Sequence, residues 1–535
     1  MVDPVASDTM RNTVGIVGAG PIGMALAARL ASFGVPTIVF ERDPELRQQG
    51  SKACLVQGDA LEVLDKFGVA EAIAARGLTW RTGHTYVRGR EIRTDEYPAR
   101  VGYGPFVNIS QWDVERAIFE HLEQEPLCTI RWGHEVSGYE ETPDGIVATT
   151  TDPDGHDRQH ELAWLVACDG VHSSMRSLAG VTWTGYTHRD RFLITDLRCK
   201  LPVVKERHFH YDPPFNRGRQ VVMHPQPDDV WRIDWQLHPD TDIEAEVESG
   251  EFDRRVRRVI GDIPYDVEWR STYRFHQRVV DRFVVGRVIF AGDAAHAYPP
   301  YGSRGMNSGF QDADNLAWKL ALVTRAQAGR ELIESYHTER YAAAKENLRV
   351  TENTLRFMVP PTRTRHLLRR IALGLSRVSG GARRRIDSGR MAAPFRYTDS
   401  PIVATGNLLD GAFAPDGLLE NETGTRRLRT LFGSDFVFVR FLGADPAPGI
   451  GLPACTVVDI REDVFAFGDG TWRDADGTVR AAFGLPVGNW ALIRPDGHVA
   501  ATGELSDVDY EAALAAAGAS RLGMSQSVAV EGAVR

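Results

Sequence analysis

The sequence contains few cysteines, no long hydrophobic run and no excess of positive charge. Its 535 residues include only five cysteines, at positions 54, 128, 168, 199 and 455, and none of them form a CxxC or a metal-ligand spacing. This scarcity excludes a cysteine-built metal centre and favours a reducing cytosol over secretion. We therefore expect a cytoplasmic protein.

The missing hydrophobic run and the negative charge exclude further classes. No stretch reaches the roughly 18 consecutive apolar residues of a membrane span, and the segment MVDPVASDTMRN has no apolar region of a signal peptide. The net charge of −10 argues against nucleic acid as a main partner. With 43% apolar residues, the chain can build the cores of more than one domain.

A glycine-rich motif, TVGIVGAGPIG, occupies residues 13–23. Gly18 would turn sharply out of a strand, Gly20 would let a pyrophosphate approach the backbone, and Gly23 would pack the next helix on the sheet. Glu41 ends the next apolar run, at the spacing of a carboxylate that binds a ribose hydroxyl. The pattern predicts an adenine dinucleotide, with an ordinary glycine-rich turn as the alternative, and leaves the choice between NAD and FAD open.

Two later segments carry motifs of their own. In ACDGVHSSMRSLAG, Asp169 and Gly170 follow an apolar run and precede a helical stretch. In RVIFAGDAAHAYPPYGSRGMNSGFQ, Gly292 and Asp293 end a predicted strand, and GMN at 305–307 opens a long amphipathic helix. Asp293 could accept hydrogen bonds from the ribityl hydroxyls of a flavin, or it could simply cap a helix.

Together the three motifs resemble those of the single-component (class A) flavoprotein aromatic hydroxylases, over at least residues 13–395. Within that family the chain is most similar to the 3-(3-hydroxyphenyl)propionate hydroxylase and phenol hydroxylase branch. The resemblance implies an α/β fold, with a Rossmann-type, GR2-like FAD-binding domain and an inserted β-sheet substrate domain. It also implies FAD as the cofactor and NADPH or NADH as a transient co-substrate.

The resemblance further implies which residues contact the cofactor. The helix start at 305–307 would stabilise the reduced flavin anion, and Gln111 would open a helix next to the ring. The full expected set is Gly18, Gly20, Pro21, Ile22, Gly23, Glu41, Arg42, Lys52, Gln111, Asp169, Gly292, Asp293, Pro300, Gly305, Met306 and Asn307. Two positions depart from the family pattern: Lys52 stands where many members have arginine, and Arg304 adds a charge before the GMN turn. Asp312, Asn315 and Lys319 recur at helical spacing, and a solvated helix face is their alternative reading.

Two stretches of different character, 80–104 and 183–280, interrupt the flavin segments and should form the substrate domain. Within it, VWRIDWQL alternates, which predicts one face with Trp231, Ile233, Trp235 and Leu237 and another with Arg232, Asp234 and Gln236. Such a sheet could roof an aromatic pocket or pack its apolar face on the flavin domain. The substrate-side candidates are His210, Tyr211, Trp235 and Pro299, and no residue is identified as the catalytic base.

The other expected domains are an FAD domain, from 1–79, 105–182 and 281–395, and a C-terminal domain over 396–535. The latter resembles the thioredoxin-like domain of phenol-hydroxylase-type members but lacks CxxC, so we expect a packing or oligomerisation role, with a homodimer as one option. Nine arginines lie between 363 and 390. Such a run is usually a solvated helix and loop, and its alternatives are a membrane, nucleic-acid or protein interface.

The predicted function is an FAD-dependent monooxygenase that uses NAD(P)H and O2 to hydroxylate a small phenolic substrate through a flavin C4a-hydroperoxide, inside a dry pocket. One alternative is a tailoring hydroxylase that acts on a larger polycyclic aromatic, and another is a non-catalytic flavin-binding interaction protein. A halogenase is disfavoured because WRIDW is not the Trp-x-Trp-x-Ile-Pro segment of those enzymes. A dehydrogenase is disfavoured because it would leave the Gly292–Asp293 motif without a purpose.

Overall fold

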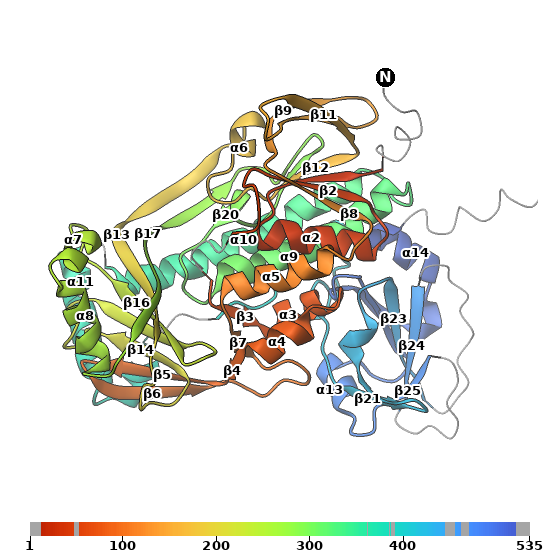
Figure 1. Ribbon diagram of the computed structural model, residues 1–535. Coiled ribbons are helices and arrows are strands. Elements are labelled where there is room, and N and C mark those ends of the chain that lie inside the picture. Colours follow the sequence, from red (N-terminus) through yellow and green to blue (C-terminus); the bar gives the residue numbers. More distant parts are fainter. Residues whose placement is uncertain are drawn as a thin grey trace, which may run out of the picture.

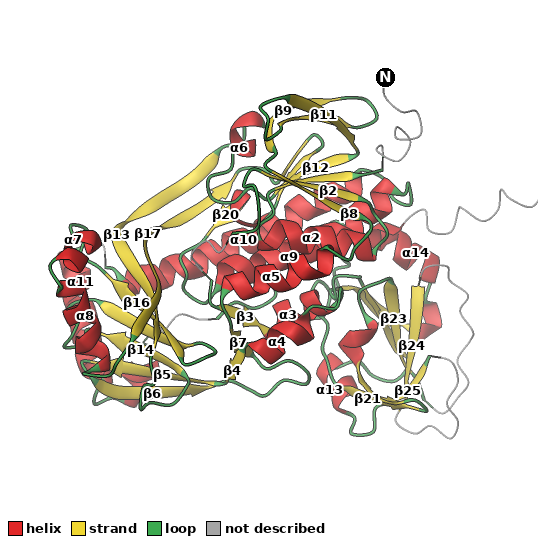
Figure 2. Cartoon of the chain, viewed as in Figure 1, coloured by secondary structure: helices red, strands yellow, loops and turns green. Residues whose placement is uncertain are grey.

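The computed structural model describes residues 12–47, 53–360, 362–384, 386, 391–443, 455–461 and 470–519. A central sheet with its helices lies between a second large sheet and a C-terminal sheet (Figures 1 and 2). The predicted cofactor residue Lys52 lies outside the described residues. Within the described ranges, no helix is both long and apolar enough to cross a membrane.

The central sheet has six strands in the order β18-β19-β12-β1-β2-β8. Their bounds are β1 Val14–Val17, β2 Thr37–Glu41, β8 Cys128–Trp132, β12 Trp164–Ala167, β18 Val284–Val285 and β19 Val288–Phe290. All neighbours are parallel except β18 and β19. Every residue of β1 and β12 is buried, as expected for strands that are covered on both faces.

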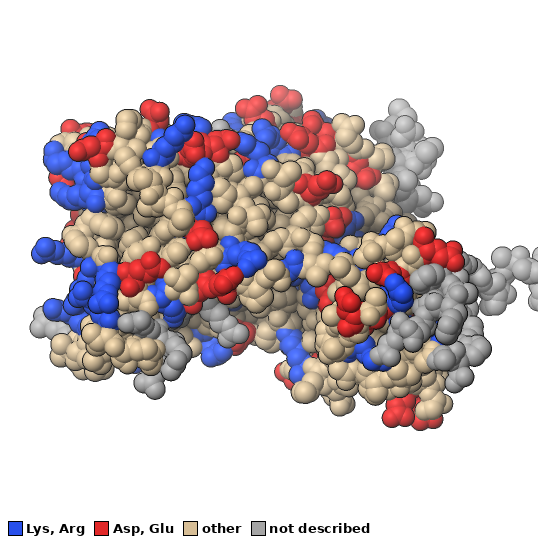
Figure 3. All heavy atoms as spheres, turned by 90° about the horizontal axis from the view of Figure 1, so that it is seen from below, with Lys and Arg blue, Asp and Glu red and all other residues tan. Residues whose placement is uncertain are grey.

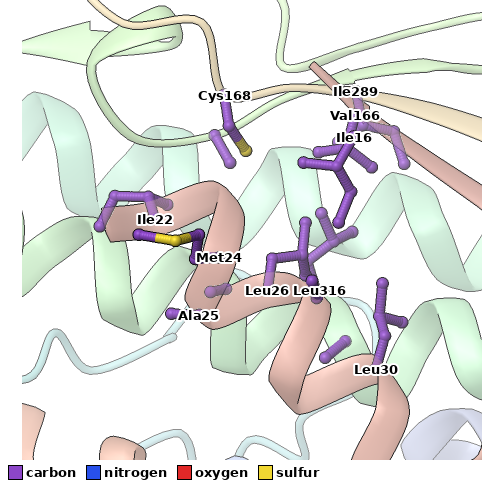
Figure 4. Close-up of a cluster of buried hydrophobic side chains, with 14 of the residues drawn as sticks. Ile16, Ile22, Met24, Ala25, Leu26, Leu30, Val166, Cys168, Ile289 and Leu316 are labelled. Carbon is purple, nitrogen blue, oxygen red and sulfur yellow. The ribbon is translucent and has the colours of Figure 1, made fainter. Parts of the chain in front are cut away.

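Four long helices pack against one face of this sheet: α2 Pro21–Ser32, α5 Gln111–Leu122, α9 Arg304–Thr324 and α10 Glu331–Met358 (Figure 1). Their apolar side chains meet those of the strands, for example Leu26 and Leu316 against Ile16 (Figure 4). The other face is covered by a small sheet of β9 Glu135–Glu141, β10 Ile146–Thr151 and β11 Asp157–Leu162. This core holds the strand ends that form the first candidate site.

Short elements extend the core toward the second large sheet. They are β3 Leu55–Gln57, β4 Leu78–Trp80 and β7 Phe106–Asn108, which form one sheet, and the helices α3 Gly58–Asp65 and α4 Ala70–Arg76. In this sheet β7 pairs with both β3 and β4 in antiparallel register. The short helix α6 Met175–Leu178 lies apart from them, beside β9 (Figure 1).

The second large sheet has eight strands in the order β20-β17-β13-β16-β15-β14-β5-β6. Their bounds are β5 Thr82–Val87, β6 Arg90–Glu96, β13 Trp183–Arg198, β14 Arg207–Tyr211, β15 Gln220–Pro225, β16 Val230–Gln236, β17 Asp266–Val280 and β20 His296–Ala297. One face packs on α7 Ile243–Glu248 and α8 Glu251–Ile260, whereas Leu373 of α11 Arg363–Ser376 packs on the opposite face. The helix α12 Gly380–Arg384 follows α11.

The C-terminal sheet has seven strands in the order β22-β21-β25-β24-β23-β26-β27. The strands are β21 Leu418–Asn421, β22 Gly424–Arg427, β23 Phe436–Phe441, β24 Cys455–Arg461, β25 Thr471–Arg473, β26 Asn489–Ile493 and β27 Val499–Glu504, with helices α13 Thr478–Phe483 and α14 Tyr510–Leu514. The strand β23 is parallel to β24 and antiparallel to β26. Phe436, Phe438 and Leu492 from this sheet pack on Trp318 of α9, which fixes the C-terminal part to the helical layer.

A buried charged cluster strengthens that junction. Glu339 of α10 accepts hydrogen bonds from Lys319 at 2.7 Å, Arg494 at 2.5 Å and Ser400 at 2.6 Å. Asn315 also donates to Glu339, at 2.7 Å. Lys319 and Asn315 are therefore buried partners of residues far along the chain, and the reading of a solvated helix face is wrong for both.

Candidate functional site

The predicted dinucleotide motifs come together at one edge of the central sheet. The loops that hold Gly20, Asp169 and Asp293 directly follow the neighbouring parallel strands β1, β12 and β19. Carboxyl ends of parallel strands share an edge, and ligands bind in the crevice outside that edge. Motifs that are separated by more than 120 residues in sequence thus form one site.

The glycines of the first motif have the conformations that close packing requires. Gly18 has φ +103°, and a Cβ there would lie 2.6 Å from the carbonyl oxygen of Cys168. A Cβ on Gly23 would lie 2.0 Å from the carbonyl oxygen of Gly18. Neither position can hold a larger residue without a backbone shift.

Gly20 differs from these two, because a Cβ there would have no atom within 4 Å. It is the N-cap of α2, whose first turn has Pro21 at its start, no acidic residue and no side-chain cap. A helix N-terminus beside open space suits a phosphate group. Ile22 in the same turn packs on Gly292 and Gly309, where added Cβ atoms would lie 3.1 and 2.5 Å from its side chain.

Glu41 is held in place at the end of β2. Its Oε2 accepts a hydrogen bond from the backbone N–H of Ala19 at 2.8 Å, and its Oε1 accepts one from Asp43 at 2.9 Å. Each oxygen keeps a second lone pair that could accept from a ribose hydroxyl. The next residue, Arg42, is exposed.

The Asp169 segment contains a polar atom that a ligand would satisfy. Asp169 Oδ2 accepts from the backbone N–H of Met175 at 3.1 Å, but its buried Oδ1 has no partner among the described residues. A buried carboxylate oxygen without a donor is costly. Arg176 donates to the carbonyls of Gly170 at 3.2 Å and Ala294 at 3.1 Å, so its guanidinium ties this segment to the Asp293 turn.

Asp312 of α9 holds the turn that contains Asp293, η1 Gly292–Ala294, in place. Asp312 Oδ2 accepts from the Gly292 N–H at 3.0 Å and contacts His296 at 2.7 Å, and its Oδ1 accepts from Arg340 at 2.6 Å. The neighbouring His296 and Arg340 lower the pKa of this carboxyl even though burial raises it. Asp312 is thus a buried support of the turn, and the reading of a solvated face is wrong here too.

The start of α9 lies next to this turn. A Cβ on Gly305 would lie 3.9 Å from Asp293 Oδ1, and Ser303, the N-cap, gives the helix no side-chain hydrogen bond. Met306 and Asn307 are buried, and Asn307 Nδ2 donates to the carbonyl of Leu55 at 3.1 Å. The side chain of Asn307 therefore joins α9 to β3, which leaves only its backbone for a cofactor.

Gln111, the first residue of α5, lies near the same crevice. Its Oε1 accepts from the backbone N–H of Ala53 at 3.3 Å, and its Nε2 donates to Glu115 at 2.8 Å. Burial raises the pKa of Glu115 to about 7, and the negative charge of Glu41 adds to the rise. The fit of these residues to a bound dinucleotide rests on the open space at Gly20 and the unpartnered Asp169 oxygen.

A cavity lies between the eight-stranded sheet and the loop 300–303 that leads into α9. Aromatic and aliphatic side chains form much of its wall, namely Phe192, Phe209, Val222, Tyr273, Phe275, Pro300, Tyr301 and Met391. Such a wall suits a flat apolar ring. The loop that closes the cavity immediately precedes the helix start beside Asp293.

Polar side chains on one face of β15 and β16 complete the cavity wall. Four of them, Gln220, His224, Asp234 and Gln236, each have a buried oxygen or nitrogen atom without a partner among the described residues. The buried Arg207 of β14 lines the cavity as well. Gln220 also donates from Nε2 to the Tyr301 hydroxyl at 2.6 Å. Unpartnered buried polar atoms that line one cavity indicate a site for a ligand with polar groups.

Asp234 stands out in this wall for its electrostatics. Burial raises the pKa of its carboxyl to about 7, although the positive charges of Arg232 and Arg207 lower it. Arg232 is itself paired with Asp196 through two hydrogen bonds of 2.8 and 2.7 Å. Asp234 can therefore exchange a proton near neutral pH.

The four predicted substrate residues do not line this cavity. Trp235 lies in the apolar cluster with Phe252 and Val256 of α8, because the helices α7 and α8 cover that face of the sheet. Tyr211 packs among buried side chains on the cavity side, and His210 faces Tyr86 on the other side, with ring centroids 4.5 Å apart. Pro299 is buried, while its neighbour Pro300 contributes to the wall.

The predicted alternation of VWRIDWQL is correct, but the polar face lines the cavity. Trp231, Ile233, Trp235 and Leu237 share the cluster on α8, whereas Asp234 and Gln236 line the cavity. Sequence reasoning missed Gln220 and His224. Their signal is the alternation Gln-x-Val-x-His in β15, which places both on the face of Val222.

Comparison with known proteins identifies the family. The sequence model of the FAD binding domain matches residues 11–351. The chain belongs to this FAD-binding family. The match spans all three motif segments and every residue that lines the cavity except Met391.

Relatives that match over more than three quarters of both chains support the assignment. The chain is 28% identical to a 3-(3-hydroxy-phenyl)propionate/3-hydroxycinnamic acid hydroxylase of Burkholderia cenocepacia, over 79% of this chain and 78% of the relative. It is 30% identical to a 12-dehydrotetracycline 5-monooxygenase/anhydrotetracycline 6-monooxygenase of Streptomyces rimosus, over 92% and 95%. The fold matches that of the flavin-dependent monooxygenase PieE in complex with FAD and substrate, with a TM-score of 0.78, 21% identity and coverage of 95% and 98%.

Proposed function

We propose that this FAD-binding protein is a monooxygenase that uses NAD(P)H and O2 to hydroxylate a phenolic aromatic substrate. The observation that carries the proposal is the cavity, whose wall combines aromatic rings with Asp234 and closes against the loop before α9. The names of the relatives agree with it, since one is a hydroxylase of 3-(3-hydroxy-phenyl)propionate and the other is a monooxygenase.

The proposed cofactor contacts follow the crevice. The N-terminus of α2 at Gly20 would hold the pyrophosphate, Glu41 a ribose, and Asp293 and the start of α9 the flavin end. Asp169, with its unpartnered Oδ1, and Gln111 would complete the site. FAD held by these residues would, once reduced by NADPH or NADH, activate O2 for transfer to the substrate, and the aromatic wall would exclude water from the reaction.

The residues of the cavity have separate proposed tasks. The ring of the substrate would lie against Phe275 and Pro300, and Gln220 and Gln236 would bind its polar groups. Asp234, as a carboxylate, would accept the proton of the phenol hydroxyl and leave an electron-rich phenolate. The neighbouring Arg232, already paired with Asp196, would moderate the negative charge.

The proposed substrate is a small phenol. A tailoring hydroxylase for a larger polycyclic aromatic is the second candidate, because the relative from Streptomyces rimosus carries a tetracycline name and matches over 95% of its length. Displacement of Met391 and of the loop 300–303 would enlarge the cavity for such a substrate.

The proposed domain division follows the sheets: an FAD domain around the central sheet, a substrate domain on the eight-stranded sheet and a C-terminal domain. We propose a thioredoxin-like fold for the last, supported by the parallel pair β23–β24 beside the antiparallel β26. Burial raises the pKa of Cys455, its single cysteine, to about 12, which opposes thiol chemistry. A packing role or a homodimer contact remains the proposed use.

The test is the spectrum of the purified protein, followed by NADPH and NADH oxidation with 3-(3-hydroxyphenyl)propionate, 3-hydroxybenzoate and resorcinol. We expect a flavin spectrum, oxidation stimulated by one phenol, and little hydrogen peroxide. Flavin without stimulation by any of these phenols would favour the polycyclic candidate. The absence of flavin, even after added FAD, would overturn the proposal.

A further inference from the structure

The helix α11 has an unusual distribution of side chains, because all its large apolar residues except Leu373 point to solvent. The exposed residues are Leu367, Leu368, Ile371 and Leu375 of the helix and Val378 in the turn after it, and they are 49 to 77% exposed. Five of the large apolar side chains exposed on the described surface thus lie within twelve residues. Isolated exposed apolar residues are ordinary, but a contiguous group marks an interaction site.

The spacing places these side chains on one stripe. Residues 367, 371 and 375 are separated by four positions each, so they follow one face of α11 turn by turn, and Val378 lies three positions further on, in the turn after the helix. The opposite face is buried: Leu373 packs beside Phe209 and Tyr211, and Arg369 lies over the Tyr211 ring. The helix is therefore fixed to the molecule by one face and presents the stripe on the other.

Basic residues border the stripe. Arg365 and Arg370 are exposed, and neither forms an ion pair within the described part of the chain. Arg377 follows Arg370 by seven positions, two helical turns, and so lies on the same side. No aspartate or glutamate occurs from residue 353 to residue 386, in a protein with a net charge of −10. Lys and Arg side chains are visible at the end of the molecule where α8 and α11 lie (Figure 3).

We propose that α11 docks this protein on an anionic membrane surface. An interfacial helix lies in the plane of the membrane, with apolar side chains in the acyl boundary and arginines at the lipid phosphates. A second copy of this chain is a less suitable partner. In a symmetric dimer the same patch would contact itself, so arginines would face arginines and repel one another. The stripe has no acidic residue that could pair with them.

The test uses the full-length FAD-loaded protein and large unilamellar vesicles in a sedimentation assay. Wild-type protein should sediment with vesicles of phosphatidylglycerol and phosphatidylcholine and much less with phosphatidylcholine alone. Arg365→Gln with Arg370→Gln should lower the partition coefficient by about 25-fold, since each arginine near such a surface contributes about fivefold. Leu368→Ser, Ile371→Ser and Leu375→Ser together should abolish binding.

A matched control is Val203→Ser with Val204→Ser, which removes two other exposed apolar side chains and should leave binding unchanged. All these side chains are exposed, so an unchanged melting temperature should show that the variants fold. Wild-type protein that stays in solution with anionic vesicles would overturn the proposal. Equal binding of the triple variant would overturn it as well, and so would a triple variant that only converts a dimer into a monomer in sedimentation velocity.

Discussion

Asp234 is the side chain on which the proposed proton transfer depends. It lines the cavity, and burial raises the pKa of its carboxyl to about 7. The carboxylate, the form that accepts a proton, is therefore populated as the pH rises through about 7. Charged or titratable groups from several packed elements surround it, namely Cys54, Asp196, Arg207, His224, Arg232 and Tyr273.

Asp234→Asn should lower the turnover of the stimulating phenol by about 10²- to 10⁴-fold, the usual contribution of a positioned base. In the wild-type enzyme kcat should rise with pH through about 7, and this rise should vanish in the variant. FAD binding should be unchanged, because the residue is outside the crevice. Asp240→Asn, an exposed change just after β16, is the control and should keep the wild-type profile. A variant that retains the wild-type pH profile would show that another group accepts the proton.

The role of Gly20 can be tested separately from the fold, because its substitution should weaken FAD binding without changing the stability of the protein. A Cβ at Gly20 meets no protein atom, so Gly20→Ala should change the melting temperature of the apoprotein little, because the less flexible unfolded chain offsets the poorer N-cap that alanine makes. The methyl group would occupy the predicted approach of the pyrophosphate, and the Kd for FAD should rise at least tenfold in a fluorescence titration. Gly138→Ala in β9, also without a neighbour, should change neither quantity. An unchanged Kd in Gly20→Ala would place the pyrophosphate elsewhere.

At the scale of elements, the cluster around Glu339 joins α9 and α10 to the C-terminal sheet. Nearby Arg494 and Lys319 lower the pKa of Glu339 to about 2, against the effect of burial. The carboxylate therefore stabilises the fold fully above its unfolded pKa, near 4.5, and this contribution is lost as the pH falls toward 2.

Glu339→Gln should lower the free energy of unfolding by about 3–5 kcal/mol at pH 7, because it leaves buried cations without their partner. Urea unfolding of both proteins should show the difference, and it should shrink as the pH falls from about 5 toward 2. Glu346→Gln, which breaks an exposed pair on the same helix, should cost at most about 1 kcal/mol. Equal losses in the two variants would contradict the role given to the cluster.

The sequence predicted the elements that depend on residues close together in the chain. It did not predict the features that depend on contacts between distant residues. The spacing of Gly18, Gly20, Gly23 and Glu41 fixes a strand, a turn and a helix within 30 residues, and the alternation in β16 assigns its two faces. Which face lines the cavity depends on α7 and α8, which cover the tryptophans. The burial of Lys319 depends on its ion pair with Glu339, and no short-range pattern in the sequence indicates that contact.

At the scale of the whole molecule, the proposed FAD site spans segments from residue 18 to residue 307, so the cofactor should stabilise the chain as one unit. A ligand at about 100 times its Kd adds about 2.7 kcal/mol. Removal of FAD should lower the melting temperature by several degrees in calorimetry, and added FAD should restore it. Gly20→Ala should show a smaller shift at equal FAD. A melting temperature that does not respond to FAD would contradict a site built from the three segments.

If the protein is the proposed monooxygenase, one oxygen atom of O2 enters the aromatic ring of the substrate, and isotope labelling follows that atom. The FAD-loaded enzyme is supplied with NADPH or NADH, the stimulating phenol and ¹⁸O₂, and the product is weighed by mass spectrometry. We expect a hydroxylated product that carries one ¹⁸O atom. Consumption of the nicotinamide with peroxide as the only product, or a product whose new oxygen comes from water, would contradict the proposed function.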